Sequence, residues 1–172
     1  MSDSPVQRLF AEPGLDWRPV SPKLVVERRL PMLGLSLVGL LLMLGGRFIA
    51  RDAHGPGVVF MSLGVLALAA AVVGWFFVVP RVVSAWRYAE REQDLLVSRG
   101  RLVRRLTVVP YGRMQVIEVS ANPVSTRLGI ATVTLVTASA STDARIPGVP
   151  VEVAQQLRDR LAAKGEASTA GL

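Results

Sequence analysis

Residues 58–79 read VVFMSLGVLALAAAVVGWFFVV, 22 apolar or small residues with no charge among them. A helix of this length covers about 33 Å, enough to cross a hydrocarbon core of ~30 Å. The preceding uncharged run, residues 30–46, reads LPMLGLSLVGLLLMLGG and covers about 25 Å as a helix. Residues 48–50 extend this run, because Arg47 can reach the membrane interface along its flexible stem. Two such segments predict a transmembrane helical hairpin over residues 30–80.

The composition agrees with a membrane protein that carries a modest soluble part. Hydrophobic residues make up 51% of the 172, and the mean hydropathy is +0.41. The absence of cysteine excludes a disulfide scaffold, a thiolate zinc site and a cysteine nucleophile. A single histidine, His54, excludes any site that needs two imidazoles.

The segments around the two runs indicate how the hairpin is built. The first run follows a polar leader, residues 1–29, and therefore begins late for a cleaved signal peptide. Residues 47–57 contain Gly55-Pro56-Gly57, a helix-breaking turn signal. We therefore expect a short loop over 47–57, with both chain ends on one side of the membrane.

The distribution of positive charge predicts the orientation of the hairpin. Five Lys and Arg residues precede the first run, two lie in the loop and thirteen follow the second run. The positive-inside rule places both termini in the cytoplasm and the loop around His54 outside, in the inner (plasma) membrane. An aromatic belt is expected at the cytoplasmic end of the second span, formed by Trp75, Phe76, Phe77 and Trp86.

Small residues recur four apart in the second run, Ala67 with Ala71 and Ala70 with Gly74. Such spacing lets a neighbouring helix approach closely. We favour the first span of the same hairpin as this neighbour over an oligomer interface.

The pattern changes after Arg81 to short β-rich runs separated by turn signals. These runs cover residues 95–97, 102–109, 115–119 and 131–137. The run 102–109 does not alternate, because Arg104 and Arg105 fall on opposite faces. We expect this strand to lie at a sheet edge, to be bent or to face a partner.

The end of the chain switches to helical periodicity. Residues 147–150, Pro-Gly-Val-Pro, read as a turn, and an apolar stripe of Val153, Leu157 and Leu161 follows at intervals of four. The predicted soluble domain therefore spans residues 81–165, several antiparallel strands closed by one amphipathic helix, and residues 166–172 read as a flexible tail.

Several short motifs occur together in an order found in one family. They are Trp86-Arg87-Tyr88, Leu95-Leu96-Val97 with Gly100, Val109 to Val116, Arg127 to Val133, Thr137-Ala138 and Ile146-Pro147-Gly148, with Trp17 to Pro22 upstream. The chain resembles the YdbS-type bacterial membrane proteins with a pleckstrin-homology-like domain, over residues 17–163. It departs from the commoner pattern at Met114 and at Ser125-Thr126. The resemblance implies a mainly-β, two-sheet, partly closed barrel with a C-terminal helix, and it assigns no chemistry.

No residue cluster reads as a catalytic or metal site. His54 with Asp52 and Arg51 supplies too few ligands for a metal, and we interpret this group as a solvated turn. A carboxylate cluster without a partner histidine reads as a solvated approach to a strand, and it consists of Glu90, Glu92 and Asp94. We therefore expect a protein that is not an enzyme and needs no cofactor.

Arginine provides the stronger signal. Four basic residues flank the spans and should lie at the inner membrane surface: Arg28, Arg29, Arg81 and Arg87. Four more occur within seven residues of one predicted hairpin and are candidates for lipid or partner contact: Arg99, Arg101, Arg104 and Arg105. Nucleic-acid binding is not expected, because no aromatic residue interrupts this group to stack on a base.

Two functions remain open from the sequence. The first is a membrane-tethered, non-enzymatic binding or scaffold module that presents its soluble domain to anionic lipids, to a protein partner or to a second copy. The alternative is an accessory subunit of a transport or envelope-stress assembly that acts through its hairpin.

Overall fold

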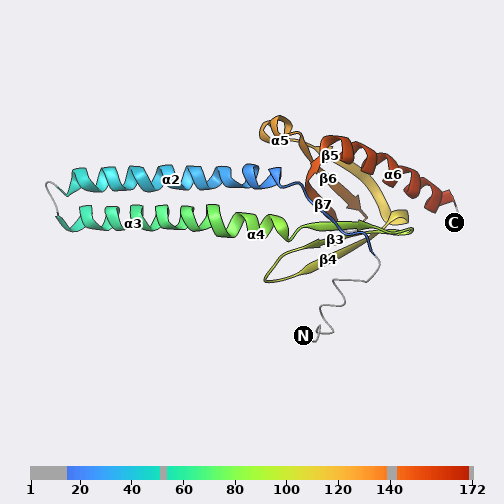
Figure 1. Cartoon of the computed structure of the whole chain (residues 1–172), viewed down its shortest axis with the longest axis horizontal. Coiled ribbons are helices and arrows are strands. Elements are labelled where there is room, and N and C mark those ends of the chain that lie inside the picture. The colour runs from blue at the N-terminus through green and yellow to red at the C-terminus, as the bar shows by residue number, and fades with distance from the viewer. Residues whose placement is uncertain (1–14, 51–53, 139–142, 171–172) are drawn as a thin grey trace. The chain divides into compact units, whose positions relative to one another are not determined.

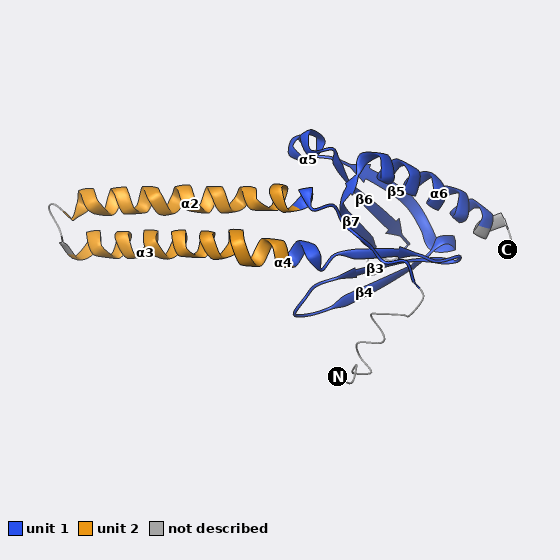
Figure 2. Cartoon of the chain, viewed as in Figure 1, with its two compact units in different colours: residues 1–24, 82–172 blue, residues 25–81 orange. Residues whose placement is uncertain are grey.

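A computed structural model describes residues 15–50, 54–138 and 143–170 of the chain (Figure 1). The chain divides into two compact units (Figure 2). The hairpin unit comprises residues 25–81, and the β domain comprises residues 1–24 together with 82–172. The leader up to Leu24 thus belongs with the β domain. The predicted boundaries differ, because they treat the leader 1–29 and the domain 81–165 as separate parts.

The hairpin unit is built from two long helices. Helix α2 spans Lys23–Ile49, and α3 spans His54–Val73 and continues through a π-helical turn, Gly74–Val78, into α4, Val79–Ser84. Both are long and apolar enough to cross a membrane, with mean hydropathies of 1.9 and 2.4. Most of their large apolar side chains are exposed, Leu66 by 66% for example, which the core helix of a soluble protein would not show.

Glycine allows the two helices to approach closely. A Cβ atom on Gly39 would lie 2.9 Å from the carbonyl oxygen of Gly64, and one on Gly46 would lie 2.8 Å from that of Gly57. Ala71 is buried, and Gly74 lies against the side chain of Met32 in the first helix. The prediction that small residues of the second helix pack on the first is confirmed for this part of the face, although Ala70 is exposed.

The loop between the helices is shorter than the predicted 47–57. Helix α2 continues to Ile49, and α3 already begins at His54, so Gly55-Pro56-Gly57 forms its first turn. Proline is tolerated there, because the first amide groups of a helix have no acceptor inside it. The reading of these residues as a helix-breaking turn is therefore wrong.

The β domain contains two antiparallel sheets. The first has the order β1-β2-β3-β4, formed by Arg18–Pro19, Arg87–Glu90, Asp94–Arg99 and Arg105–Pro110. The second has the order β5-β6-β7, formed by Met114–Ser120, Ile130–Thr137 and Ala144–Pro150. Strand β4 is an edge strand, as expected, but it starts only at Arg105, so the predicted run 102–109 begins three residues too early.

Helix α6, Val151–Ala170, packs on the second sheet and closes the core (Figure 1). Leu157 and Leu161 of the predicted stripe are fully buried, while Val153 is half-buried. The core of the two sheets includes the fully buried side chains of Leu95, Leu96, Val109, Ile130, Val133, Leu135, Ile146 and Val149. The helix ends at Ala170, well inside the predicted tail of 166–172.

Residues 147–150 form the end of strand β7 and not the predicted turn. The strand pairs with β6 across a register shift between Ala131 and Val133. Gly148 has φ +68°, a conformation open to glycine, and a Cβ atom there would lie 2.7 Å from Cβ of Leu24. The local turn signal is overridden by strand pairing and by the leader that packs on this glycine.

The β domain contains a short helix where Asn122-Pro123 is interpreted from the sequence only as a turn between strands. Helix α5 spans Pro123–Leu128. Asn122 caps its start by accepting a hydrogen bond from the Ser125 amide, and Gly129 ends it in the left-handed conformation at φ +67°. Asparagine before proline, with glycine after the last turn, is a typical pair of helix boundaries.

Candidate functional site

The arginine loop, residues 99–105, connects β3 to β4. Arg99 and Arg105 are cross-strand partners at the last pair of the two strands, and residues 101–104 form the bend between them. Gly100 starts the bend with φ +89°. Like charges placed directly opposite each other destabilise a strand pair, so this end of the sheet carries an unfavourable arrangement.

The loop has no acidic counterpart among the described residues. The ion pairs of the described β domain involve other arginines, namely Arg18, Arg91, Arg158 and Arg160. Arg99 lies over the ring of Trp86, with 5.8 Å between its guanidinium carbon and the ring centroid. All four arginines are exposed residues, so their charge is available to solvent or to a ligand.

A groove of about 400 Å³ borders the loop. Its lining joins the loop to the start of β2 and to the end of α4: Trp17, Ser84, Ala85, Arg87, Ser98, Gly100, Arg101 and Arg104. The fold thus brings Arg87, predicted as a membrane-surface residue, to the same groove as Arg101 and Arg104. It also places Ser84, the last residue of α4, beside the loop.

The other three predicted membrane-surface residues belong to the hairpin unit. Arg28 is exposed, and the guanidinium carbon of Arg29 lies 4.9 Å from the centroid of the Trp75 ring. Arg81 donates a hydrogen bond of 3.0 Å to the carbonyl oxygen of Phe77 and lies over the ring of that residue. Arginine over an aromatic ring is a favourable contact that keeps the charge near the helix end.

Two carboxylates of the predicted cluster at the β2–β3 turn have arginine partners that the sequence did not indicate. Glu90 forms an ion pair with Arg160 at 2.9 Å, and its side chain is only 17% exposed. The interpretation of Glu90 as solvated is therefore wrong, since α6 brings the arginine to it from 70 residues away. Asp94 pairs with Arg91 at 3.6 Å, while Glu92 is exposed.

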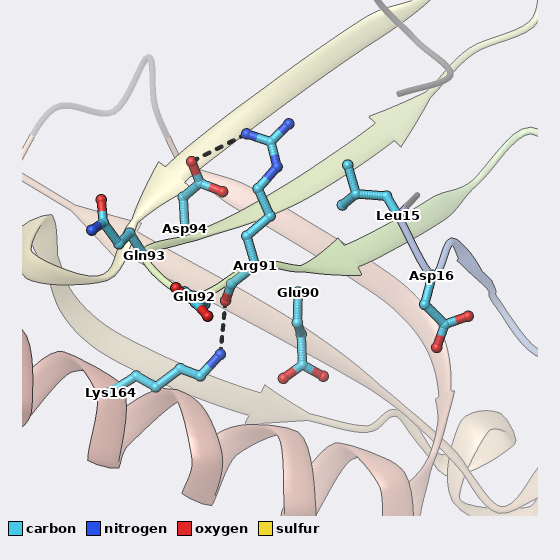
Figure 3. A pocket seen from close by; sticks show the side chains of 8 residues that line it. All are labelled: Leu15, Asp16, Glu90, Arg91, Glu92, Gln93, Asp94 and Lys164. Atoms are coloured by element: carbon cyan, nitrogen blue, oxygen red, sulfur yellow. Dashed lines mark hydrogen bonds and ion pairs between the residues drawn. The ribbon is translucent and has the colours of Figure 1, made fainter. Parts of the chain in front are cut away.

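Lys164 and Tyr111 complete this cluster. The ammonium group of Lys164 donates to the Arg91 carbonyl oxygen at 2.8 Å (Figure 3). The Tyr111 hydroxyl donates to the same oxygen at 3.0 Å. Burial raises the pKa of Tyr111 to about 12, and the nearby Glu90 and Asp94 carboxylates add to the shift. A cavity of about 740 Å³ is lined by part of this cluster, namely Glu90, Arg91, Asp94 and Lys164. The contacts of Arg160 with Glu90 and of Lys164 with the Arg91 carbonyl oxygen hold α6 to the β2–β3 turn, which is a structural role.

The predicted group of Arg51, Asp52 and His54 lies only partly within the described residues. Arg51 and Asp52 lie outside them, and His54 itself is the first residue of α3. Within residues 15–50, 54–138 and 143–170, no group of three histidine, cysteine or carboxylate residues is arranged to hold a metal ion.

Comparison with known proteins places the chain in a family. Residues 33–165 match the family model described as Bacterial PH domain. The chain belongs to this family. The match covers the hairpin as well as the β domain, so the two-helix segment is part of the family pattern.

A curated relative extends this result. The chain is 29% identical over 143 residues to the UPF0699 transmembrane protein YdbS of Bacillus subtilis (strain 168), covering 83% of this chain and 88% of that protein. No solved structure matches the chain. The family and the relative establish a YdbS-like membrane protein with a PH-like domain, as the sequence motifs indicated.

Proposed function

We propose that this chain is a non-enzymatic, membrane-tethered module whose PH-like domain contacts anionic lipid headgroups at the inner face of the plasma membrane. The observation that carries the proposal is the arginine loop, which has four exposed arginines and no carboxylate partner among the described residues. Each basic group near an anionic leaflet contributes roughly 1 kcal/mol.

Chain connectivity favours the membrane as the source of counter-charge. Ser84 borders the same groove as the loop. It lies five helical residues after Val79, where the second apolar run ends. Five residues rise about 7.5 Å, comparable to the headgroup layer of roughly 5–8 Å on each side of a bilayer. A loop beside Ser84 is therefore within reach of lipid headgroups, whereas an acidic protein would have to be recruited.

The proposed orientation has its own test, which the lack of native cysteine makes free of background. A cysteine at His54 should react with a membrane-impermeant thiol reagent in whole cells. One at Ser139, which lies outside the described residues, should react only after lysis. The reverse labelling pattern would contradict the cytoplasmic placement of the β domain.

Lipid contact is tested with the full chain reconstituted in vesicles that contain spin-labelled phosphatidylglycerol or phosphatidylcholine. The wild type should immobilise the anionic label preferentially. Replacing Arg101, Arg104 and Arg105 by Gln should reduce this preference at least fivefold at low salt, since the loss of one group at roughly 1 kcal/mol already corresponds to about fivefold. The difference should shrink in high salt, because exposed charges are screened.

A matched control removes the same charge elsewhere in the β domain. The variant with Arg113, Arg145 and Arg158 replaced by Gln has three other exposed arginines neutralised and should keep the lipid preference. Equal preference in wild type and both variants would refute lipid contact through the loop, and an acidic protein partner would become the explanation of the unpaired arginines.

A further inference from the structure

The centre of the arginine loop is apolar. Leu102 and Val103 have exposed fractions of 101% and 73%, the two highest of all large hydrophobic side chains in the described residues. They exceed Phe48 at 70% and Leu66 at 66%, which lie on the two candidate spans. The loop therefore exposes its apolar tip more fully than the transmembrane helices expose theirs.

The surroundings of this tip separate it from an ordinary surface leucine. Scattered single apolar residues are normal on a protein surface. Here two adjacent ones stand between pairs of arginines, Arg99 and Arg101 before them and Arg104 and Arg105 after them. An apolar tip with a cationic collar fits the boundary between acyl chains and anionic headgroups.

We propose that Leu102 and Val103 insert into the bilayer interface and make the loop a second membrane anchor. The inference rests on the proposed function for placing the loop at the membrane, and it adds contact with the acyl region, which salt does not screen. A second copy of the chain is a poorer occupant, because its own collar would bring eight guanidinium groups together without a carboxylate.

The anchor has a consequence for the β domain. The domain continues directly into both helices, since α2 begins at Lys23 and α4 ends at Ser84. Insertion of the loop, in addition to these two connections, would restrict rotation of the domain about them. It would hold the groove between Arg87, Arg101 and Arg104 against the headgroup layer.

The experiment uses the full chain in vesicles, with a nitroxide attached at Val103→Cys. Electron paramagnetic resonance then compares collisions of the label with oxygen, which concentrates in the bilayer, and with a water-soluble nickel complex. We expect high oxygen and low nickel accessibility at this position. A label at Glu92→Cys, in the exposed β2–β3 turn, should give the opposite ratio.

A companion variant corrects for the apolar character of the label itself. Adding Leu102→Asp should lower the ratio of inserted to aqueous loop by roughly tenfold or more, the effect of losing one buried leucine. Because Leu102 is fully exposed, its replacement leaves the domain core intact. The matched control, Val116→Asp, changes a 54% exposed valine on β5 and should leave the ratio unchanged.

Vesicle composition separates this inference from the proposed function. Insertion that is equal in neutral and anionic vesicles supports the anchor and contradicts the role of anionic lipid. A label exposed to the nickel complex in both kinds of vesicle refutes the anchor, and the lipid-preference assay then decides the proposed function alone. A label shielded from both reagents means contact with protein and also refutes the anchor.

Discussion

The packing of the leader on strand β7 makes a sharp prediction at Gly148. Its φ of +68° costs a residue with a Cβ atom about 1–2 kcal/mol. The added methyl group would also lie 2.7 Å from Cβ and 3.0 Å from Cδ2 of Leu24, which is 2% exposed. Overpacking of a core typically costs a further 1–3 kcal/mol. Gly148→Ala should therefore lower the free energy of unfolding by about 2–5 kcal/mol.

Gly129 provides the matched control. It has nearly the same backbone, φ +67°, but the nearest atom to an added Cβ is Nζ of Lys23 at 3.9 Å. Gly129→Ala should show the backbone cost alone, about 1–2 kcal/mol. The difference between the two variants isolates the contact between Leu24 and β7.

Thermal unfolding of the full chain in detergent micelles, followed by circular dichroism of the strands, measures the difference. In a domain of this size 1 kcal/mol shifts Tm by roughly 4–8 °C. Gly148→Ala should therefore unfold at least about 4 °C below Gly129→Ala. Equal midpoints would show that the leader does not pack on β7, and would refute the assignment of residues up to Leu24 to the β domain.

Three further predictions follow from the burial of tyrosine, the glycine contacts of the hairpin and the reach of the leader. Burial raises the pKa of Tyr111 to about 12 and also raises that of Tyr88, so the folded state holds phenolic protons that the unfolded state releases near pH 10. The free energy of unfolding in urea should therefore decrease as the pH rises from 10 to 12, and the tyrosines should not affect it below pH 10. Tyr111→Phe should make this decrease smaller; an unchanged pH dependence would contradict the raised pKa of Tyr111. Gly64→Val should lower the thermal stability of the hairpin, because even a Cβ at this position would lie 2.6 Å from the Gly39 carbonyl oxygen, whereas Gly34→Val meets open space and should not. The fragment 81–165 should show a mainly strand circular dichroism spectrum with some helix, but at a lower Tm than the full chain, because buried leader side chains are missing from it; a disordered spectrum would mean that the leader is required for folding.

Some features were predictable because they depend on local composition. The two apolar runs identify membrane-spanning helices, since partition into a bilayer is decided by each segment's own length and hydropathy. Strand β6 was predicted because Val133 and Leu135 alternate with threonines and one face is buried. The apolar stripe of α6 was predicted because its apolar residues recur with the period of a helix.

Other features required the tertiary structure. Strand β1, Arg18–Pro19, is too short to show any periodicity and exists because it pairs with β2, which lies almost 70 residues later. Proline and glycine at 147–148 favour a turn locally, and only the pairing with β6 and the contact with Leu24 make this segment a strand. Local signals lose here because long-range hydrogen bonds and burial contribute more than the preference of a few residues.

The candidate site shows the same division. The sequence alone determined that four arginines crowd into residues 99–105 and that two apolar residues interrupt them, because these are properties of a continuous segment. Only the fold decided that Leu102 and Val103 are left uncovered by the rest of the domain, that Arg87 and Ser84 border the loop, and that Arg160 pairs with Glu90. Strand register and helix packing set these neighbours, and both depend on contacts between residues far apart in the chain.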